Sequence, residues 1–412
     1  MKLFSEYRGL RRELYVLFFG RIVTAMGSLI WPMLTLILSS KLNMSAGQIA
    51  TTMLVMTLLQ LPASLIGGKV ADHFNKRNII IICDLVTVIC YLICGFIKID
   101  LMFVGLFFIA GLFASIEGPA YDALIADMSS SQDREKAYSL NYLGANIGVI
   151  VAPTLGGLLF KNYLNLAFII TALATLSSTI LIYIFIKDIS KVKDIDNISS
   201  IYEDDMDDHS SIQVLKKRKT ILFYFLVVGV MELVYSQFNY LMPLNLSQLY
   251  GDTGAVLFGT LTSLNGLVVI IATPLLTKLL VKLKDVDKIT WGEIFMVASF
   301  IAYVLIQGNM MVYYFAMIIF TIGEVICTLG KQPYLTRRIP ASHRGRIASM
   351  IMIFQMIFKS VSQKGIGSII DNFNYQFAWG IIVVIGGISI VMLLVLKYLD
   401  RKEYKLLYSN ED

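Results

Sequence analysis

Long apolar stretches with few charges recur along the whole chain. Twelve of them reach the length of about 20 residues that an α-helix needs to cross the hydrocarbon core of a bilayer. Every backbone N–H and C=O inside a bilayer must be hydrogen-bonded within the protein, and segments of this length without strict alternation meet that need as helices. The predicted spans are residues 14–39, 46–70, 78–97, 101–126, 137–160, 165–186, 220–246, 254–281, 290–307, 310–335, 345–370 and 376–398.

The composition excludes a soluble protein. Apolar residues make up 57% of the 412 residues and charged residues 16%, whereas soluble domains carry roughly 45–50% and about 25%. Disordered, collagen-like and disulfide-scaffold chains are excluded by the same comparison. The net charge of +6 would favour binding to nucleic acid. The basic residues, however, lie mostly in the loops on one side of the predicted membrane, so no nucleic-acid partner is expected. The fold class is therefore predicted to be an all-α membrane protein with twelve transmembrane helices.

The orientation follows from the distribution of Lys and Arg. Of these 35 residues, 29 lie in the N-terminus, the C-terminal tail and alternate loops, while the opposite loops hold only Lys41, Lys98 and Lys161. Basic residues stay on the cytoplasmic side, so both termini are predicted to be cytoplasmic. The first apolar stretch is too long for a cleavable signal and is expected to remain as a helix. We expect a multi-pass protein of a bacterial inner membrane.

One long polar segment, 187–219, follows the sixth span and combines an acidic run with a basic one. It is interpreted as a solvated cytoplasmic linker between two six-helix halves, 1–186 and 220–412. A weak repeat supports related halves: a proline and a tyrosine, Pro119 and Tyr121 or Pro333 and Tyr334, precede basic residues between the fourth and fifth helix of each half. Duplicated bundles around a central site are a transporter plan.

The loop between the second and third spans reads GGKVADHFNKR over residues 67–77. Gly68 would let a neighbouring helix approach closely, and Asn75 tolerates the left-handed conformation of a tight reversal. Asp72 is placed to accept from a helix N-terminus or an arginine. This loop resembles the helix 2–3 signature of the major facilitator superfamily, with His73 in place of an arginine and Asn75 in place of a glycine. The resemblance implies two pseudo-symmetric six-helix bundles and a gating role for Gly68, Asp72 and Arg77.

Two further motifs carry the resemblance. The fifth span holds Gly148, Pro153, Gly156 and Gly157. This pattern resembles the glycine–proline motif of the proton-antiporter branch. The resemblance implies that these residues take part in the conformational switch. Simple helix packing explains these glycines equally well. Glu324 follows a glycine, similar to the Gly-Glu pair of some drug:proton antiporters.

The chain also departs from these relatives. Glu117 lies where many drug antiporters carry a membrane arginine, and Asn239 replaces an aspartate of some relatives.

Charges inside the predicted spans are the candidates for function. A charge at the bilayer centre costs on the order of 3 kcal/mol, so such residues should converge on a wet cavity. A carboxyl in apolar surroundings favours its protonated form and can carry a proton; alternatively it is permanently paired and only holds helices together. The predicted proton-coupling residues are Glu324, Glu232 and Glu117. The predicted substrate-binding residues share polar helix faces and are Arg21, Tyr121, Tyr235, Asn239, Lys359 and Gln363.

Other chemistry is sparse. Asp84 and Glu293 are expected to form interfacial pairs, and the four cysteines are interpreted as buried apolar filler. No phosphate-binding loop or metal-ligand spacing occurs, so no cofactor, no metal and no enzyme activity are expected.

The predicted function is secondary transport: proton-coupled efflux of small amphipathic or lipophilic compounds by a monomer that alternates between inward- and outward-open states. The expected partners are a small-molecule substrate, protons and the lipid bilayer. Two alternatives stay open. Arg21, Lys331 and Lys359 would suit an uptake symporter or lipid-type flippase for an anionic solute. A sensor without transport, or a membrane enzyme, is the other.

Overall fold

The computed structural model describes residues 9–130, 133–186, 215, 217–306, 308–339 and 344–408. All regular structure within these ranges is helical, without strands, which confirms the predicted fold class. The segment 187–214, most of the predicted linker, lies outside the described residues, so the division of the chain there stays a prediction.

The helices fall into two compact units, described separately. Unit 1 comprises Met1–Met44, Thr51–Asn197 and Leu246–Gly266, and unit 2 comprises Ser45–Ala50, Ile198–Asn245 and Leu267–Asp412. The helices of the first half are α1 (Arg12–Gly27), η2 (Trp31–Met33), α2 (Leu34–Leu36), η3 (Ile37–Lys41), α3 (Ala46–His73), α4 (Lys76–Phe96), α5 (Leu101–Met128), α6 (Arg134–Phe160) and α7 (Leu164–Phe185). Those of the second half are α9 (Lys219–Tyr235), η4 (Ser236–Phe238), α10 (Leu241–Tyr250), α11 (Asp252–Leu279), α12 (Asp285–Leu305), α13 (Met310–Arg338), α14 (Arg344–Asn372), α15 (Tyr375–Glu403) and η6 (Lys405–Leu407).

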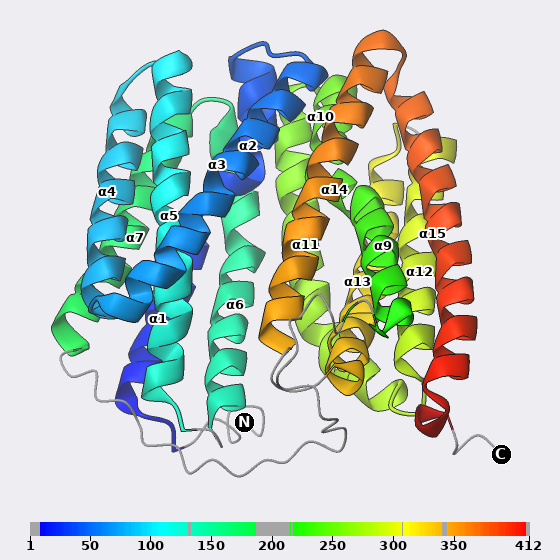
Figure 1. Ribbon diagram of the computed structural model, residues 1–412. Coiled ribbons are helices and arrows are strands. Elements are labelled where there is room, and N and C mark those ends of the chain that lie inside the picture. Colours follow the sequence, from blue (N-terminus) through cyan, green and yellow to red (C-terminus); the bar gives the residue numbers. More distant parts are fainter. Residues whose placement is uncertain are drawn as a thin grey trace. The chain divides into compact units, whose positions relative to one another are not determined.

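Within unit 1, α4 packs between α5 and α7, and α1 packs against α6 and α7 (Figure 1). Within unit 2, α12 packs against α13 and α15 (Figure 1). The start of α3 belongs to unit 2 because the Asp371 carboxylate at the end of α14 accepts from the backbone N–H groups of Ala46 (3.0 Å) and Gly47 (2.9 Å). An anionic side chain is stabilised at a helix N-terminus, where these N–H groups have no partner within the helix.

The described helices include eleven that are long and apolar enough to cross a membrane, and each overlaps a predicted span. The eleventh predicted span, 345–370, forms the 29-residue helix α14 but does not meet that criterion. Its polar residues, among them Gln355, Lys359 and Gln363, lower its mean hydropathy.

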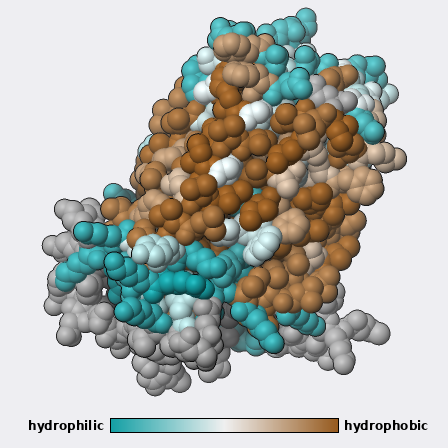
Figure 2. Space-filling view, turned by 90° about the vertical axis from the view of Figure 1, so that its right-hand side faces the viewer, coloured by the Kyte–Doolittle hydropathy of each residue, from teal (hydrophilic) through white to brown (hydrophobic). Residues whose placement is uncertain are grey.

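Apolar side chains cover the outer surface of the helices. Leu65, Phe315 and Val384 expose 64%, 67% and 64% of their area, and Figure 2 shows a broad hydrophobic zone between hydrophilic edges on one face. Apolar patches of this extent do not face water in soluble monomers. The chain is a multi-pass membrane protein.

The first and seventh spans are broken, which the sequence analysis did not anticipate. In the first, α1 ends at Gly27 and 3-10 and π turns follow, with Pro32 in the 3-10 turn η2. In the seventh, α9 ends at Tyr235 and the 3-10 turn η4 precedes α10. Irregular backbone at membrane depth is tolerated only where protein or a wet cavity surrounds it. Both breaks lie beside the polar residues described below.

Glycines of α6 form the predicted groove for a partner helix. A Cβ atom at Gly148 would lie 2.2 Å from that of Ala25, and one at Gly156 would lie 2.5 Å from the Leu29 carbonyl oxygen, both in the first span. A Cβ atom at Gly157 would lie 2.6 Å from the carbonyl oxygen of Ala255 in α11. Only a residue without a side chain allows this approach on either side of α6.

The loop between α3 and α4 differs from the prediction in two respects. Asn75 has φ −66°, outside the left-handed region, and its side chain caps α4 by accepting from the Asn78 N–H (3.3 Å). Gly68 has no described atom within 4 Å of its Cβ position, so it does not mediate a close approach. Gly67 does, because its Cβ would lie 2.5 Å from the Ile116 carbonyl oxygen of α5.

Two other residues of this loop, Arg77 and Asp72, are predicted to take part in gating. Arg77 Nη2 donates to the Tyr183 carbonyl oxygen of α7 (2.6 Å), and its guanidinium lies 5.0 Å from the Tyr183 ring centroid. Arg77 therefore ties α4 to α7. The side chain of Asp72 lies outside the described part of the chain.

These neighbouring glycines provide a matched test of helix packing. Gly67→Ala is expected to lower the thermal unfolding temperature, because the new methyl group collides with the α5 backbone. Gly68→Ala should leave it unchanged or raise it, since alanine favours a helix interior by roughly 0.5–1 kcal/mol over glycine. Thermal unfolding of both variants in detergent measures the difference, and equal destabilisation of the two would contradict the packing described for Gly67.

Candidate functional site

A polar cavity of about 370 Å³ lies within unit 1, lined by residues of the first span and of α4, α5, α6 and α7. Arg21, Glu117 and Tyr121, three of the residues that the sequence singles out, all line it. The cavity falls in the size range of small-molecule sites, which are roughly 300–1,000 Å³.

Two carboxyl groups meet in this cavity. Asp84, on α4, is 6% exposed, and Glu117, on α5, lines the same cavity. The Thr179 hydroxyl of α7 donates to Asp84 Oδ2 at 2.6 Å. The position of Asp84 in its span predicts an interfacial pair, but Asp84 lies on a cavity wall, because its face of α4 packs towards α5 and α7.

The cation of the cavity is Arg21 from α1. Its guanidinium carbon lies 5.9 Å from the ring centroid of Tyr121, and its buried Nε has no hydrogen-bond partner among the described residues. Tyr121 is 7% exposed and its hydroxyl donates to the Leu17 carbonyl oxygen at 3.1 Å. The tyrosine therefore links α5 to α1 while its ring borders the cavity.

An aromatic wall closes part of the cavity. Trp31 Nε1 donates to the Tyr91 hydroxyl at 3.0 Å, and the Trp31 ring lies 4.8 Å from that of Phe107. Trp31 belongs to the 3-10 turn η2, so the break in the first span is what places an indole here. Apolar walls with a few polar groups are typical of sites for small organic molecules.

Sequence reasoning missed several residues of this cavity. Thr87 and Asn141 line it, and Thr87 Oγ1 and Asn141 Oδ1 are buried without a hydrogen-bond partner among the described residues. Asp122 also lines it but is exposed. Thr87 lies one turn after Asp84, and that spacing was the only sequence signal for it.

Unit 2 holds the second group of predicted residues. The Tyr235 hydroxyl, at the end of α9, donates to Glu324 Oε1 of α13 at 2.7 Å. The Tyr235 ring stacks on Phe320, with centroids 5.8 Å apart. The structure thus brings together two residues 89 positions apart in the chain, and the Tyr235 hydroxyl helps to orient the Glu324 carboxyl.

The break in the seventh span has its own polar contacts. Gln237, in η4, is fully buried, and its Nε2 donates to the Ser362 hydroxyl of α14 at 2.8 Å. Gln363, next to that serine, is 4% exposed. Asn239 is exposed beyond the end of α9, so the predicted polar stripe from Glu232 to Asn239 is interrupted by the helix end.

The carboxyls of unit 2 differ in accessibility. Glu232 is partly buried, and Lys331 and Lys359 are among the charged residues that interact with it. Glu293 is fully buried, and its Oε1 accepts from the Ser389 hydroxyl of α15 at 2.5 Å. Glu293 is therefore enclosed between α12 and α15, whereas Glu232 and Glu324 are not.

The family model described as Major Facilitator Superfamily matches residues 17–362. The chain belongs to the major facilitator superfamily. The expectation drawn from the loop and glycine motifs is thereby confirmed, and with it the assignment as a transporter rather than an enzyme.

The superfamily relatives with sequence similarity are bacterial transporters. An uncharacterised transporter of Bacillus subtilis, YqjV, is 24% identical over 93% of this chain and 92% of its own length. A protein of Planococcus maritimus named Na(+), Li(+), K(+)/H(+) antiporter is 21% identical over 71% of this chain and 74% of its own. The multidrug resistance protein MdtG of Yersinia enterocolitica is 24% identical over 65% of each chain.

Solved structures agree in fold. A peptide transporter of the POT family, in complex with sulfate, has a TM-score of 0.78 at 16% identity and covers 96% of this chain and 95% of its own. A bacterial homologue of the lysosomal transporter Spinster has a TM-score of 0.68 at 13% identity, covering 94% and 96%. These similarities show the major facilitator fold.

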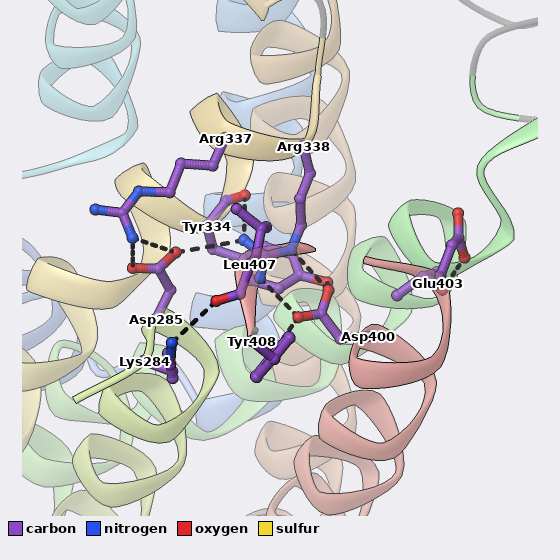
Figure 3. Close-up of polar contacts among 10 residues, drawn as sticks. Lys284, Asp285, Tyr334, Arg337, Arg338, Asp400, Glu403, Leu407 and Tyr408 are labelled. Carbon is purple, nitrogen blue, oxygen red and sulfur yellow. Dashed lines mark hydrogen bonds and ion pairs between the residues drawn. The ribbon is translucent and has the colours of Figure 1, made fainter. Parts of the chain in front are cut away.

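A buried ion network joins the ends of α12, α13 and α15 in unit 2 (Figure 3). Arg338 Nε and Nη2 both donate to Asp400 at 2.6 Å, and Arg338 Nη1 reaches Asp285 at 3.3 Å. The hydroxyls of Tyr334 and Tyr408 donate to the same Asp400 carboxylate. Both Arg338 and Asp400 are almost inaccessible, so each depends on the other for its charge to be tolerated.

This network sets the ionisation of its members. Burial lowers the pKa of the Arg338 guanidinium, but the hydrogen bonds and charge of Asp400 outweigh it and raise that pKa above its ordinary value. Burial and the Asp400 hydrogen bond raise the pKa of Tyr408. Tyr408 therefore remains a protonated donor to Asp400 at every physiological pH.

Removal of one partner of the network should be strongly destabilising. Asp400→Asn leaves the Arg338 guanidinium short of its main counter-ion, and breaking such a buried pair costs about 3–5 kcal/mol. Asp287→Asn is the control, since its pair with Lys397 (2.6 Å) is partly exposed and such pairs contribute about 0–1 kcal/mol. Unfolding of both variants in detergent is the measurement; similar losses would show that the network is not a main stabilising contact.

Proposed function

We propose that this chain is a proton-coupled exporter of small amphipathic compounds, an antiporter of the bacterial inner membrane with both termini in the cytoplasm. The two units change their orientation in alternation, and the substrate crosses as they do so.

The observation that carries this proposal is the cavity of unit 1. It combines the aromatic wall of Trp31 and Tyr91 with the carboxyl pair of Asp84 and Glu117 in about 370 Å³. An apolar wall suits the hydrophobic part of an amphipathic compound, and convergent polar groups suit its charged part. The same carboxyls are able to hold protons in apolar surroundings.

The charges of the cavity favour a cationic over an anionic substrate. Asp84, Glu117 and Asp122 supply three carboxyls, while Arg21 is the single guanidinium among the lining residues. An anionic solute, the substrate of the alternative uptake symporter or flippase, would be repelled by this excess of acidic groups.

Glu324 is the candidate proton carrier of unit 2. Its carboxyl is partly buried and receives a hydrogen bond from the Tyr235 hydroxyl at 2.7 Å. Protonation and deprotonation of this group would alter its contact with α9, next to the break in the seventh span. Glu232, Asn239, Lys359 and Gln363 are proposed as further polar contacts on the substrate path.

The names of two relatives support coupled antiport. One relative is named a cation/proton antiporter and another a multidrug resistance protein. The glycine–proline segment of α6 is proposed to serve the conformational switch, because Pro153, Gly156 and Gly157 lie where backbones of other helices approach most closely.

Transport in proteoliposomes tests the proposal. Wild type is expected to move ethidium, an aromatic monocation, against its gradient when a pH gradient is imposed. Glu324→Gln should abolish this driven flux while ethidium exchange without a gradient persists, because the amide cannot release a proton. Glu293→Gln is the matched control, since Glu293 is enclosed against Ser389, and it should retain driven flux. Driven flux by Glu324→Gln at the wild-type rate would remove Glu324 from the coupling mechanism.

A further inference from the structure

The unit 1 cavity shows the marks of a site built for a polar ligand. Thr87 is 6% exposed, lines the cavity, and its Oγ1 has no hydrogen-bond partner among the described residues. The buried atoms Arg21 Nε, from α1, and Asn141 Oδ1, from α6, also have no hydrogen-bond partner among the described residues. A buried polar atom without a partner costs about 1–3 kcal/mol. Three such atoms around one cavity indicate that something polar fills it.

The contacts of Asp84 require a proton. An ionised carboxylate offers only acceptors. The Thr179 hydroxyl lies close to two acceptors at once. It lies 2.6 Å from Asp84 Oδ2 and 2.8 Å from the Thr175 carbonyl oxygen, but it has one hydrogen to donate. A proton on Asp84 satisfies both contacts.

The surroundings fix how many protons the pair holds. The ionisable groups that face it are Arg21 from α1, Cys83 and Tyr91 from α4, and Tyr121 and Asp122 from α5. The lining residues of α6 and α7 are uncharged. With one proton, on Asp84, the pair carries a single negative charge, which the Arg21 guanidinium balances, and Asp122 is exposed to solvent. With no proton, one carboxylate is left without a counter-ion.

We propose that Asp84 and Glu117 form a one-proton carboxyl pair whose proton is exchanged for a monovalent organic cation bound in this cavity. The bound cation replaces the proton as counter-charge: the Asp84 O–H bond breaks, the proton leaves to water, and two carboxylates remain, one facing Arg21 and one facing the cation. No electrons are transferred. One cation enters for one proton released, so the exchange at this site is electroneutral.

The rest of the cavity suits such a ligand. The hydrogen bond from Trp31 to Tyr91 holds two aromatic rings in fixed positions beside the carboxyls. Aromatic faces attract organic cations by about 0.5–2 kcal/mol, depending on how far the cation is desolvated. Thr87 Oγ1 and Asn141 Oδ1 are available as acceptors for N–H groups. The inference deepens the proposed function and rests on it, since exchange of a cation for a proton serves an antiporter.

Proton-linked binding to the solubilised full-length protein tests the pair directly. Ethidium binding to wild type should release about one proton per bound cation, and its apparent Kd should rise about tenfold for each pH unit of acidification while the pair is protonated. Asp84→Asn and Glu117→Gln each leave a single carboxyl that Arg21 balances. Both variants should bind ethidium with a Kd that hardly changes with pH, and with little proton release.

Two controls locate the effect. Glu293→Gln removes a buried carboxyl of unit 2 and should keep the wild-type pH dependence. Phenanthridine, the uncharged parent ring of ethidium, should release no proton from wild type. The slope of Kd against pH measures proton release even where a variant binds ethidium more weakly. Elution of each variant as a single species in size-exclusion chromatography checks that the variant is folded.

The outcomes distinguish this inference from the proposed function. The inference is overturned if wild type does not bind ethidium, if its binding is independent of pH, or if the two variants keep the wild-type slope. If that happens while pH-driven ethidium flux persists, the proposed function stands and the proton exchanges elsewhere. If the slope behaves as expected but driven flux is absent, the carboxyl pair stands and the exporter proposal fails.

Discussion

The need to satisfy charged and polar groups within apolar helices underlies every polar feature of this structure. An ionised carboxyl in such surroundings must be paired, hydrogen-bonded or protonated. Asp400 is paired with Arg338, Glu293 is hydrogen-bonded to Ser389, and Asp84 meets a second carboxyl. The first two arrangements are enclosed and hold helices together. The third borders the cavity of unit 1, which is why the chemistry of exchange is assigned there.

The backbone polar groups of the two broken spans must also be satisfied, and both breaks lie beside polar side chains. In the first span the helix stops at Gly27, and the turns that follow carry Ser28 and Trp31 to the cavity of unit 1. In the seventh span it stops at Tyr235, whose hydroxyl reaches Glu324. Corresponding helices of the two halves are thus interrupted beside their polar residues. An unbroken helix would aim these side chains along a single stripe, whereas a break lets neighbouring residues point in different directions.

Glycine supplies the complementary packing. Along α6, Gly148 and Gly156 bring the first span within backbone contact, and Gly157 does the same for α11. Lipid gives helices no hydrophobic reason to associate, so close van der Waals contact has to hold unit 1 together. A tightly packed α1 and α6 in turn keep Arg21 and Asn141 at fixed positions around the cavity. Stability and the geometry of the site therefore depend on the same small residues.

The sequence by itself determined the fold class, the positions of the spans, the superfamily and the close packing of the α6 glycines, because hydropathy, length and small-residue spacing act locally along each helix. It also singled out Arg21, Glu117 and Tyr121, since a charge at membrane depth is conspicuous in any apolar stretch. It misplaced Asp84 and overlooked the unpartnered hydroxyl of Thr87. Whether a carboxyl meets a cation, a hydroxyl or another carboxyl depends on how α4 rotates against α5 and α7. Only tertiary packing decides that rotation, because each helix by itself leaves the orientation of its faces undetermined.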